Sequence, residues 1–112
     1  MQPKRIAQLV REAAEAKLAV DPVILDISRQ TAFAHYFFIT HGNSERHVHA
    51  IAQNILEELE KHGVTCWHRE GMTEGRWALL DFGPVIAHVF YRDQRDFYGL
   101  ERLWGNAPQL KA

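Results

Sequence analysis

The stretch WALLDFGPVIAHVF, residues 77–90, decides how this chain folds. Two apolar runs flank the pair Gly83-Pro84, and this pattern predicts two antiparallel strands, 76–82 and 85–90, joined as a hairpin. With a loop of only these two residues, Leu79 faces His88 across the hairpin. Because side chains alternate along a strand, the hairpin then has two faces of different composition.

One face of the predicted hairpin is small and apolar, as a sheet face covered by helices should be. It carries Ala78, Leu80, Ala87 and Val89. The other face carries Trp77, Leu79, Asp81, Ile86, His88 and Phe90. Aromatic anchors with polar neighbours are typical of a surface that is wet in the free protein and covered in a complex. The alternative is a second core layer with His88 buried and hydrogen-bonded, although few elements remain to cover a second face.

Periodicity outward from the hairpin predicts the remaining elements. The expected strands are 23–27, 36–40 and 64–68, and the expected helices are 3–18, the segment between Ser44 and Gly63, and 93–104. The middle helix has the clearest pattern, with one face made of Val48, Ile51, Ala52, Ile55, Leu56 and Leu59. The last helix should direct Phe97, Leu100 and Trp104 toward the core, and 105–112 should be a loose tail. The order predicts a single α/β domain over 1–112, with helices packed against a mixed five-stranded sheet.

Composition limits the classes of function. The 112 residues carry a formal net charge of -1, and no basic run exceeds Lys4-Arg5, so a protein surface is a better expected contact than nucleic acid. The chain has one cysteine, Cys66, which excludes an internal disulfide and suits a reducing compartment. No stretch resembles a signal peptide or a membrane span, so a cytoplasmic location is expected.

Metal and cofactor chemistry have little support in the residues. Among seven histidines, His47 and His49 lie two apart on the predicted helix and so point to different faces. Cys66 stands within an expected strand, where a buried and inert thiol is the simplest interpretation. We therefore expect no metal and no cofactor.

A catalytic interpretation rests on Gly42 to Ser44, which precede a helix start where backbone N–H groups could hold an anion. This turn is similar to the Gly-Ser turn of nucleotidyltransferases, which also need paired carboxylates for magnesium. The chain has no Asp-x-Asp sequence. An ordinary helix cap is therefore the preferred interpretation, and no enzyme activity is expected.

Six pieces of sequence, in order, resemble the Iojap or ribosomal silencing factor family. They are YFFI at 36–39, G-x-S-x-RHV at 42–48 with AIA at 50–52, EG at 70–71, W-x-LLD-x-G at 77–83, VIAHVF at 85–90 and R-x-FY-x-LE-x-LW at 95–104. The resemblance implies a nucleotidyltransferase-like topology without catalytic carboxylates. It also implies binding to large-subunit ribosomal protein fourteen, which blocks joining of the small subunit and lowers translation when nutrients are scarce. Members are also linked to ribosome assembly, and some self-associate, so a homodimer is an open expectation.

With this resemblance, the mixed hairpin face becomes the expected docking site. Trp77 and Phe90 are predicted as apolar anchors, with Leu79 between them, Asp81 and His88 as polar partners, and Glu70 and Gly71 at the rim. The chain departs from the common family pattern at His35, His41 and Pro84, and Pro84 puts the hairpin loop in question. Two alternatives stay open: a divergent nucleotidyltransferase-like enzyme and an RNA-binding factor in ribosome assembly.

Overall fold

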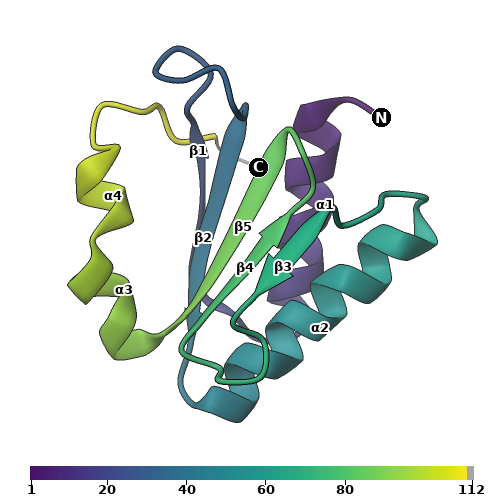
Figure 1. The fold of residues 1–112 in the computed structure, drawn as a ribbon, viewed down its shortest axis with the longest axis vertical. Helices are drawn as coiled ribbons and strands as arrows, with labels where there is room; N and C mark the ends of the chain where they lie inside the picture. Colours follow the sequence, from purple (N-terminus) through teal and green to yellow (C-terminus); the bar gives the residue numbers. More distant parts are fainter. Residues whose placement is uncertain (111–112) are drawn as a thin grey trace.

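A computed structural model describes residues 1–110 and contains a mixed five-stranded sheet in the order β1-β2-β5-β4-β3 (Figure 1). The strands are β1 Val20–Asp26, β2 Tyr36–Gly42, β3 His68–Glu70, β4 Trp77–Asp81 and β5 Val85–Tyr91. The helices are α1 Pro3–Glu15, α2 Glu45–Lys61, α3 Arg92–Tyr98 and α4 Leu100–Leu103. Strands β2 and β5 are parallel and the other neighbours antiparallel, which confirms the predicted α/β class and mixed sheet.

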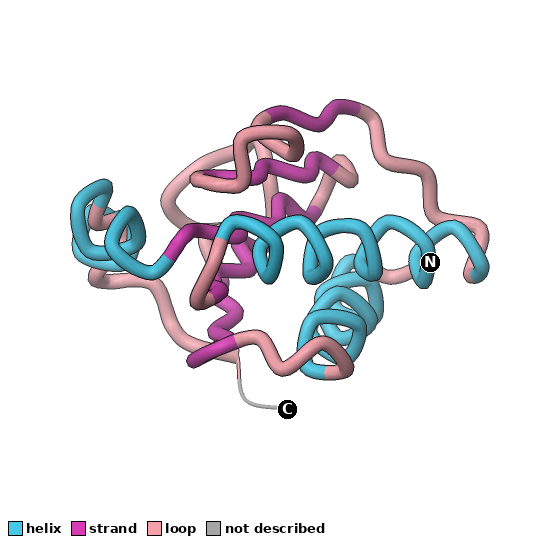
Figure 2. Tube along the Cα trace, turned by 90° about the horizontal axis from the view of Figure 1, so that it is seen from below, coloured by secondary structure: helices cyan, strands magenta, loops and turns pink. Residues whose placement is uncertain are grey.

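Helices α1 and α2 cover one face of the sheet, and the short segment α3–α4 lies against the other (Figure 2). The predicted apolar face of α2 is buried in full, and Ser44 caps this helix by accepting the His47 backbone N–H at 3.0 Å. Ala78, Leu80, Ala87 and Val89 are all completely buried in the same core. The small residues of the hairpin therefore face α1 and α2, as predicted.

The hairpin has the predicted register. Asp81 pairs with Ile86, Leu79 with His88 and Trp77 with Phe90. The Phe82 N–H donates to the Val85 carbonyl at 2.9 Å across the two-residue loop, so Pro84 does not lengthen the turn. Gly83 has φ of +91° and donates its N–H to the Asp81 carboxylate at 2.7 Å.

The expected strand 64–68 is wrong in its position. Pairing begins where the Trp67 N–H donates to the Asp81 carbonyl, and β3 extends over His68–Glu70 at the sheet edge. The chain leaves α2 at Gly63 and meets β4 only at Trp67. Residues 64–66 cross this gap as a loop, and Val64 and Cys66 pack against the core between the sheet and helices α1 and α2.

The expected helix 93–104 is divided by Gly99, which adopts a left-handed conformation with φ of +60°. The side chain of Phe97 is 76% exposed, so its predicted burial is wrong. Leu100 and Trp104 are directed inward as predicted, and they pack on a second core, which lies between the sheet and α3–α4.

The segment expected as a loose tail is bonded to β1 as far as the structure describes it. Asp26 N–H donates to the Pro108 carbonyl, and Leu110 N–H donates to the Ile24 carbonyl. That expectation is wrong for 105–110, while 111–112 lie outside the described residues. No helix in the described part of the chain has the length and apolar character needed to cross a membrane.

Candidate protein-docking surface

The sheet face opposite α1 and α2 is only partly covered, by α3–α4 on that side of the sheet (Figure 1). These helices pack over β1, β2 and part of β5, and they reach β4 at Trp77. The uncovered half carries a set of partly or fully exposed side chains that share one face by register. We call this set the outer strip: His68, Glu70, Trp77, Leu79, Asp81 and Ile86. On the outer strip, apolar side chains from β4 and β5 lie beside charged or polar side chains from β3 and β4.

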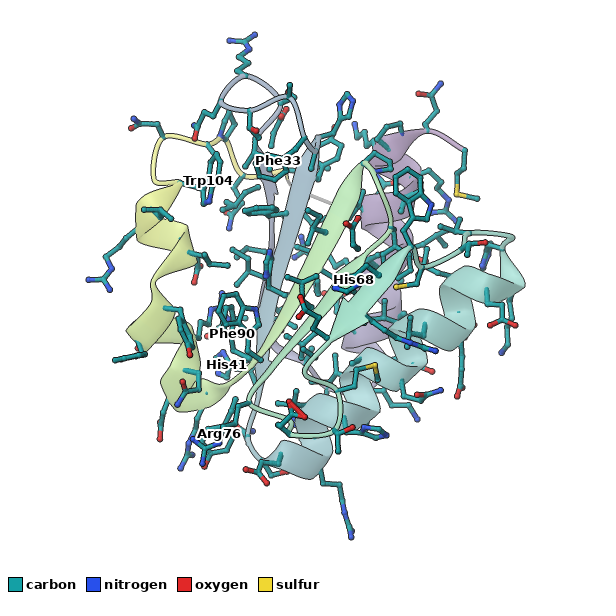
Figure 3. All side chains as sticks on the ribbon, viewed as in Figure 1. Phe33, His41, His68, Arg76, Phe90 and Trp104 are labelled. Carbon is teal, nitrogen blue, oxygen red and sulfur yellow. The ribbon has the colours of Figure 1, made fainter. Side chains whose placement is uncertain are left out.

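The structure separates the predicted site residues into two layers. Trp77, Leu79, Asp81 and Glu70 lie on the outer strip, and Gly71 lies at its rim. His88 and Phe90 lie beneath it, 4% and 0% exposed, so the expectation that the whole face is wet is wrong for these two. Two short helices suffice to bury them, since Leu100 and Trp104 pack on this second core (Figure 3). The second-core alternative is therefore correct for His88 and Phe90.

Trp77 belongs to the outer strip and also contacts the buried layer beneath it. Its ring centroid lies 4.4 Å from that of Tyr98 and 5.0 Å from that of Phe90. Its indole Nε1–H donates to His88 Nδ1 at 3.1 Å. Trp77 is thus a partly exposed aromatic group whose position is set by the packing of α3 and by a buried polar atom.

His88 is neutral at physiological pH because burial lowers the pKa of its imidazole to about 4. Since Nδ1 accepts the indole hydrogen, the neutral ring carries its own hydrogen on Nε2. This Nε2 is buried and has no hydrogen-bond partner among the described residues. The ring meets Phe37 edge to face, with centroids 4.8 Å apart.

The polar residues of the outer strip place negative charge on it. Asp81 uses Oδ1 to hold the Gly83 N–H, which orients its carboxylate at the end of the hairpin. The Glu70 carboxylate lies 3.1 Å from His68 Nε2, and both side chains are more than half exposed. An exposed pair of this kind contributes little to stability, so these groups remain free to face a partner.

The backbone at Gly71 requires a glycine. It has φ of +76°, and a Cβ atom there would lie 1.9 Å from the Trp77 carbonyl oxygen. The close approach holds the β3–β4 connection against the first residue of β4. Gly71 therefore helps to position Trp77 from the backbone side.

Sequence reasoning missed two exposed aromatic residues that pack on the same side of the sheet. Tyr98, 46% exposed, packs on Trp77, and Phe33, 59% exposed, meets Trp104 edge to face at 6.2 Å (Figure 3). The break at Gly99 is the signal that could have identified Tyr98, because it ends the helical period before Leu100. Phe33 lies in the β1–β2 connection, where periodicity gives no information.

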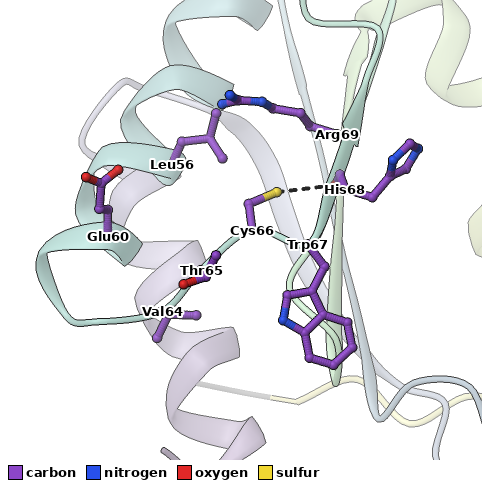
Figure 4. A pocket seen from close by; sticks show the side chains of 8 residues that line it. All are labelled: Leu56, Glu60, Val64, Thr65, Cys66, Trp67, His68 and Arg69. Carbon is purple, nitrogen blue, oxygen red and sulfur yellow. Dashed lines mark hydrogen bonds between the residues drawn. The ribbon is translucent and has the colours of Figure 1, made fainter.

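Two other features of the chain offer little chemistry. A cavity of about 610 Å³ between α2 and the β3 edge is lined by residues that include Cys66, Trp67 and Arg69 (Figure 4). Burial raises the pKa of the Cys66 thiol, which donates to the His68 carbonyl at 3.2 Å, so the reactive thiolate is disfavoured. Within residues 1–110, no three His, Cys, Asp or Glu side chains gather as a metal site would require.

The helix start considered as an anion site is occupied by its own side chains. Ser44 Oγ accepts the His47 N–H, and the Asn43 N–H donates to His47 Nδ1 at 3.0 Å. The opposite ring nitrogen of His47 contacts the Lys17 carbonyl at 2.7 Å. These bonds tie α2 to the end of α1 and take up N–H groups that an anion would need.

Comparisons with known proteins match nearly the whole chain. A family model described as "Ribosomal silencing factor during starvation" matches residues 1–112. The chain is 42% identical to ribosomal silencing factor RsfS of Bacillus subtilis, over 96% of this chain and 92% of that protein. It is 34% identical to the chloroplastic protein Iojap of Zea mays, over 92% of this chain and 44% of that one. A crystal structure of protein CV0518 from Chromobacterium violaceum superposes with a TM-score of 0.92 at 35% identity, covering 94% of this chain and 88% of that chain.

Proposed function

This chain belongs to the ribosomal silencing factor family, and from that premise we propose that it binds the large ribosomal subunit and blocks joining of the small subunit. The observation that carries the proposal is the outer strip, a largely uncovered half of a sheet face with Leu79 in its middle and Trp77 at its border with α3. Partly buried aromatic anchors of this kind dominate the energy of protein interfaces. The role is regulatory and needs no catalysis, so repression of translation follows from occupancy alone.

The proposed partner on the large subunit is ribosomal protein fourteen. Ribosomal proteins are generally basic, and the outer strip offers the Asp81 and Glu70 carboxylates beside its apolar groups. Complementary charge of this kind fixes orientation and speeds association more than it raises affinity. The proposal places the protein in the cytoplasm, where bacterial ribosomal subunits join. A homodimer formed through the outer strip would compete with the ribosome for the same residues.

Co-sedimentation of the purified protein with separate large and small subunits tests this proposal. We expect association with free large subunits only. Leu79→Lys places a cation on the outer strip without entering either core, because Leu79 is only partly buried, and it should weaken association by at least about tenfold. Trp77→Ala should cost at least ~2 kcal/mol of binding free energy, as truncation of an aromatic anchor does.

Trp67→Ala is the matched control. Trp67 is 73% exposed, but it precedes β3 at a position that alternates away from His68 and lines the cavity beside α2. Its loss should leave association with large subunits unchanged. Equal effects of the Trp67 and Leu79 substitutions would contradict docking on the outer strip, and a wild-type protein that sediments with neither subunit would contradict the function itself.

A further inference from the structure

Trp77 has a single polar group, its indole N–H, and that group is bonded inside the protein. Nε1–H donates to His88 Nδ1 at 3.1 Å, and His88 is 4% exposed. Because this edge of the ring faces the interior, the part of Trp77 left accessible on the outer strip is its carbon edge. An interfacial tryptophan usually needs an acceptor for its N–H, whereas this one already has one.

We propose that His88 is the positioning residue of the docking surface: it holds Trp77 in one ring orientation, so that Trp77 offers the outer strip an apolar edge only. The inference rests on the proposed function, because that function makes Trp77 an anchor. The orientation of Trp77 defines the chemistry of the group on the partner that meets it. The group that meets Trp77 is aliphatic or aromatic and offers no acceptor, while basic groups belong only at the rim, opposite Asp81 and Glu70.

Among the described residues, His88 is the acceptor to which the Trp77 indole N–H is bonded, and this bond favours one of the two ring orientations. A tryptophan ring turns about χ2 between two broad wells. Phe90 and Tyr98 hold the plane of the ring, with centroids 5.0 Å and 4.4 Å away, but the Phe90 ring has no acceptor for an N–H. Turning the ring over would leave His88 Nδ1 buried without its donor, which is unfavourable.

His88 is suited to this role because its own position is fixed. Its ring stacks with Phe90 at an interplanar angle of 11° and meets Phe37 edge to face. Its Nε2 is buried without a partner among the described residues, and a buried polar group of that kind is normally selected against. A phenylalanine would fill the same space without this cost, so the Nδ1 acceptor is the feature that accounts for a histidine here.

Hydrogen exchange of the three indole N–H groups, followed by NMR on the ¹⁵N-labelled protein, tests the inference without a ribosome. We expect the Trp77 indole to exchange at least about tenfold more slowly than the exposed Trp67 indole. His88→Phe removes the acceptor and should abolish this protection, with a parallel loss of affinity for large subunits. His88→Asn keeps an acceptor oxygen near the Nδ1 position and should restore part of both.

The alternative results are distinguishable. A Trp77 indole that exchanges as fast as Trp67 in the wild type would overturn the inference, and so would protection that survives in His88→Phe. Should that variant not fold, Trp77→Phe supplies a second test: adding His88→Asn to it should cost no further affinity, and an added loss would overturn the inference. Protection that depends on His88 in a protein that binds no large subunits would refute the proposed function and leave the positioning of Trp77 supported.

Discussion

At the scale of the residue, His88 connects the buried layer of the molecule to its surface. The imidazole is 4% exposed and bonds a side chain that we propose as an anchor. Burial lowers its pKa from 6.5 to about 4. A neutral ring accepts the Trp77 hydrogen, whereas a protonated ring would have no free lone pair to do so.

This pKa predicts a dependence of stability on pH. The folded-state pKa lies below the unfolded value, so the unfolded chain binds more protons between pH 4 and 6.5. Stability is therefore complete above the unfolded pKa and falls as the pH decreases toward the folded pKa, by about 2 kcal/mol between roughly pH 8 and pH 5. Urea unfolding of the wild type at both pH values measures the loss.

His88→Asn is the control for that measurement, because it removes the titrating group and keeps an acceptor. The loss of stability between the two pH values should shrink by about 2 kcal/mol in this variant. His41, whose pKa is lowered by burial and by Arg95, adds a loss of the same sign to both proteins and cancels in the difference. An unchanged pH dependence would show that His88 titrates normally.

The sequence could identify the residues of the surface but not their depth. Alternation in the stretch 77–90 placed Trp77, Leu79, Asp81, His88 and Phe90 on one face, and the structure has them there. Burial of His88 and Phe90 depends on the path of α3–α4, which packs on β5 and reaches β4 at Trp77. The segment turns at Gly99, and the alternation of side chains along a strand cannot predict where a later helix will lie.

At the scale of the element, α3–α4 is held to the sheet by Arg95. This guanidinium, with its side chain only 8% exposed, makes two bonds to the Glu101 carboxylate at 2.8 and 3.0 Å. It also donates to the Val20 carbonyl and contacts His41 Nδ1 at 2.9 Å. One side chain thus joins α3, α4, β1 and β2, and it keeps Tyr98 in place against Trp77.

Glu101→Gln should therefore loosen α3–α4. It leaves Arg95 without its compensating charge, and since Glu101 is 42% exposed we expect a cost of about 1–2 kcal/mol, below that of a fully buried pair. Amide hydrogen exchange should rise in α3 and α4 and stay unchanged in α2. Arg102→Gln, which loses only an exposed bond to the Asp96 carbonyl, should change neither. A uniform rise over all helices would contradict this local role.

At the scale of the whole molecule, the order of elements was largely predictable because most of them have a strong local pattern. The buried face of α2 and the hairpin register illustrate this. Contacts between segments that are distant in the sequence could not be predicted, because no local pattern encodes them. Residues 105–110 carry no strand pattern, yet Pro108 and Leu110 bond to β1. The edge strand β3 likewise takes its position from β4 rather than from its own residues.

Under the proposed function, one partly uncovered sheet face is sufficient to keep two ribosomal subunits apart. The most direct measurement is subunit joining, followed by light scattering or sucrose gradients, after purified protein is added to large subunits before small ones. The proposed function predicts that wild-type protein prevents joining in proportion to the large subunits it occupies. It also predicts that Leu79→Lys fails to do so at the same concentration and that Trp67→Ala acts as wild type. Normal joining of large subunits saturated with the wild-type protein would contradict it.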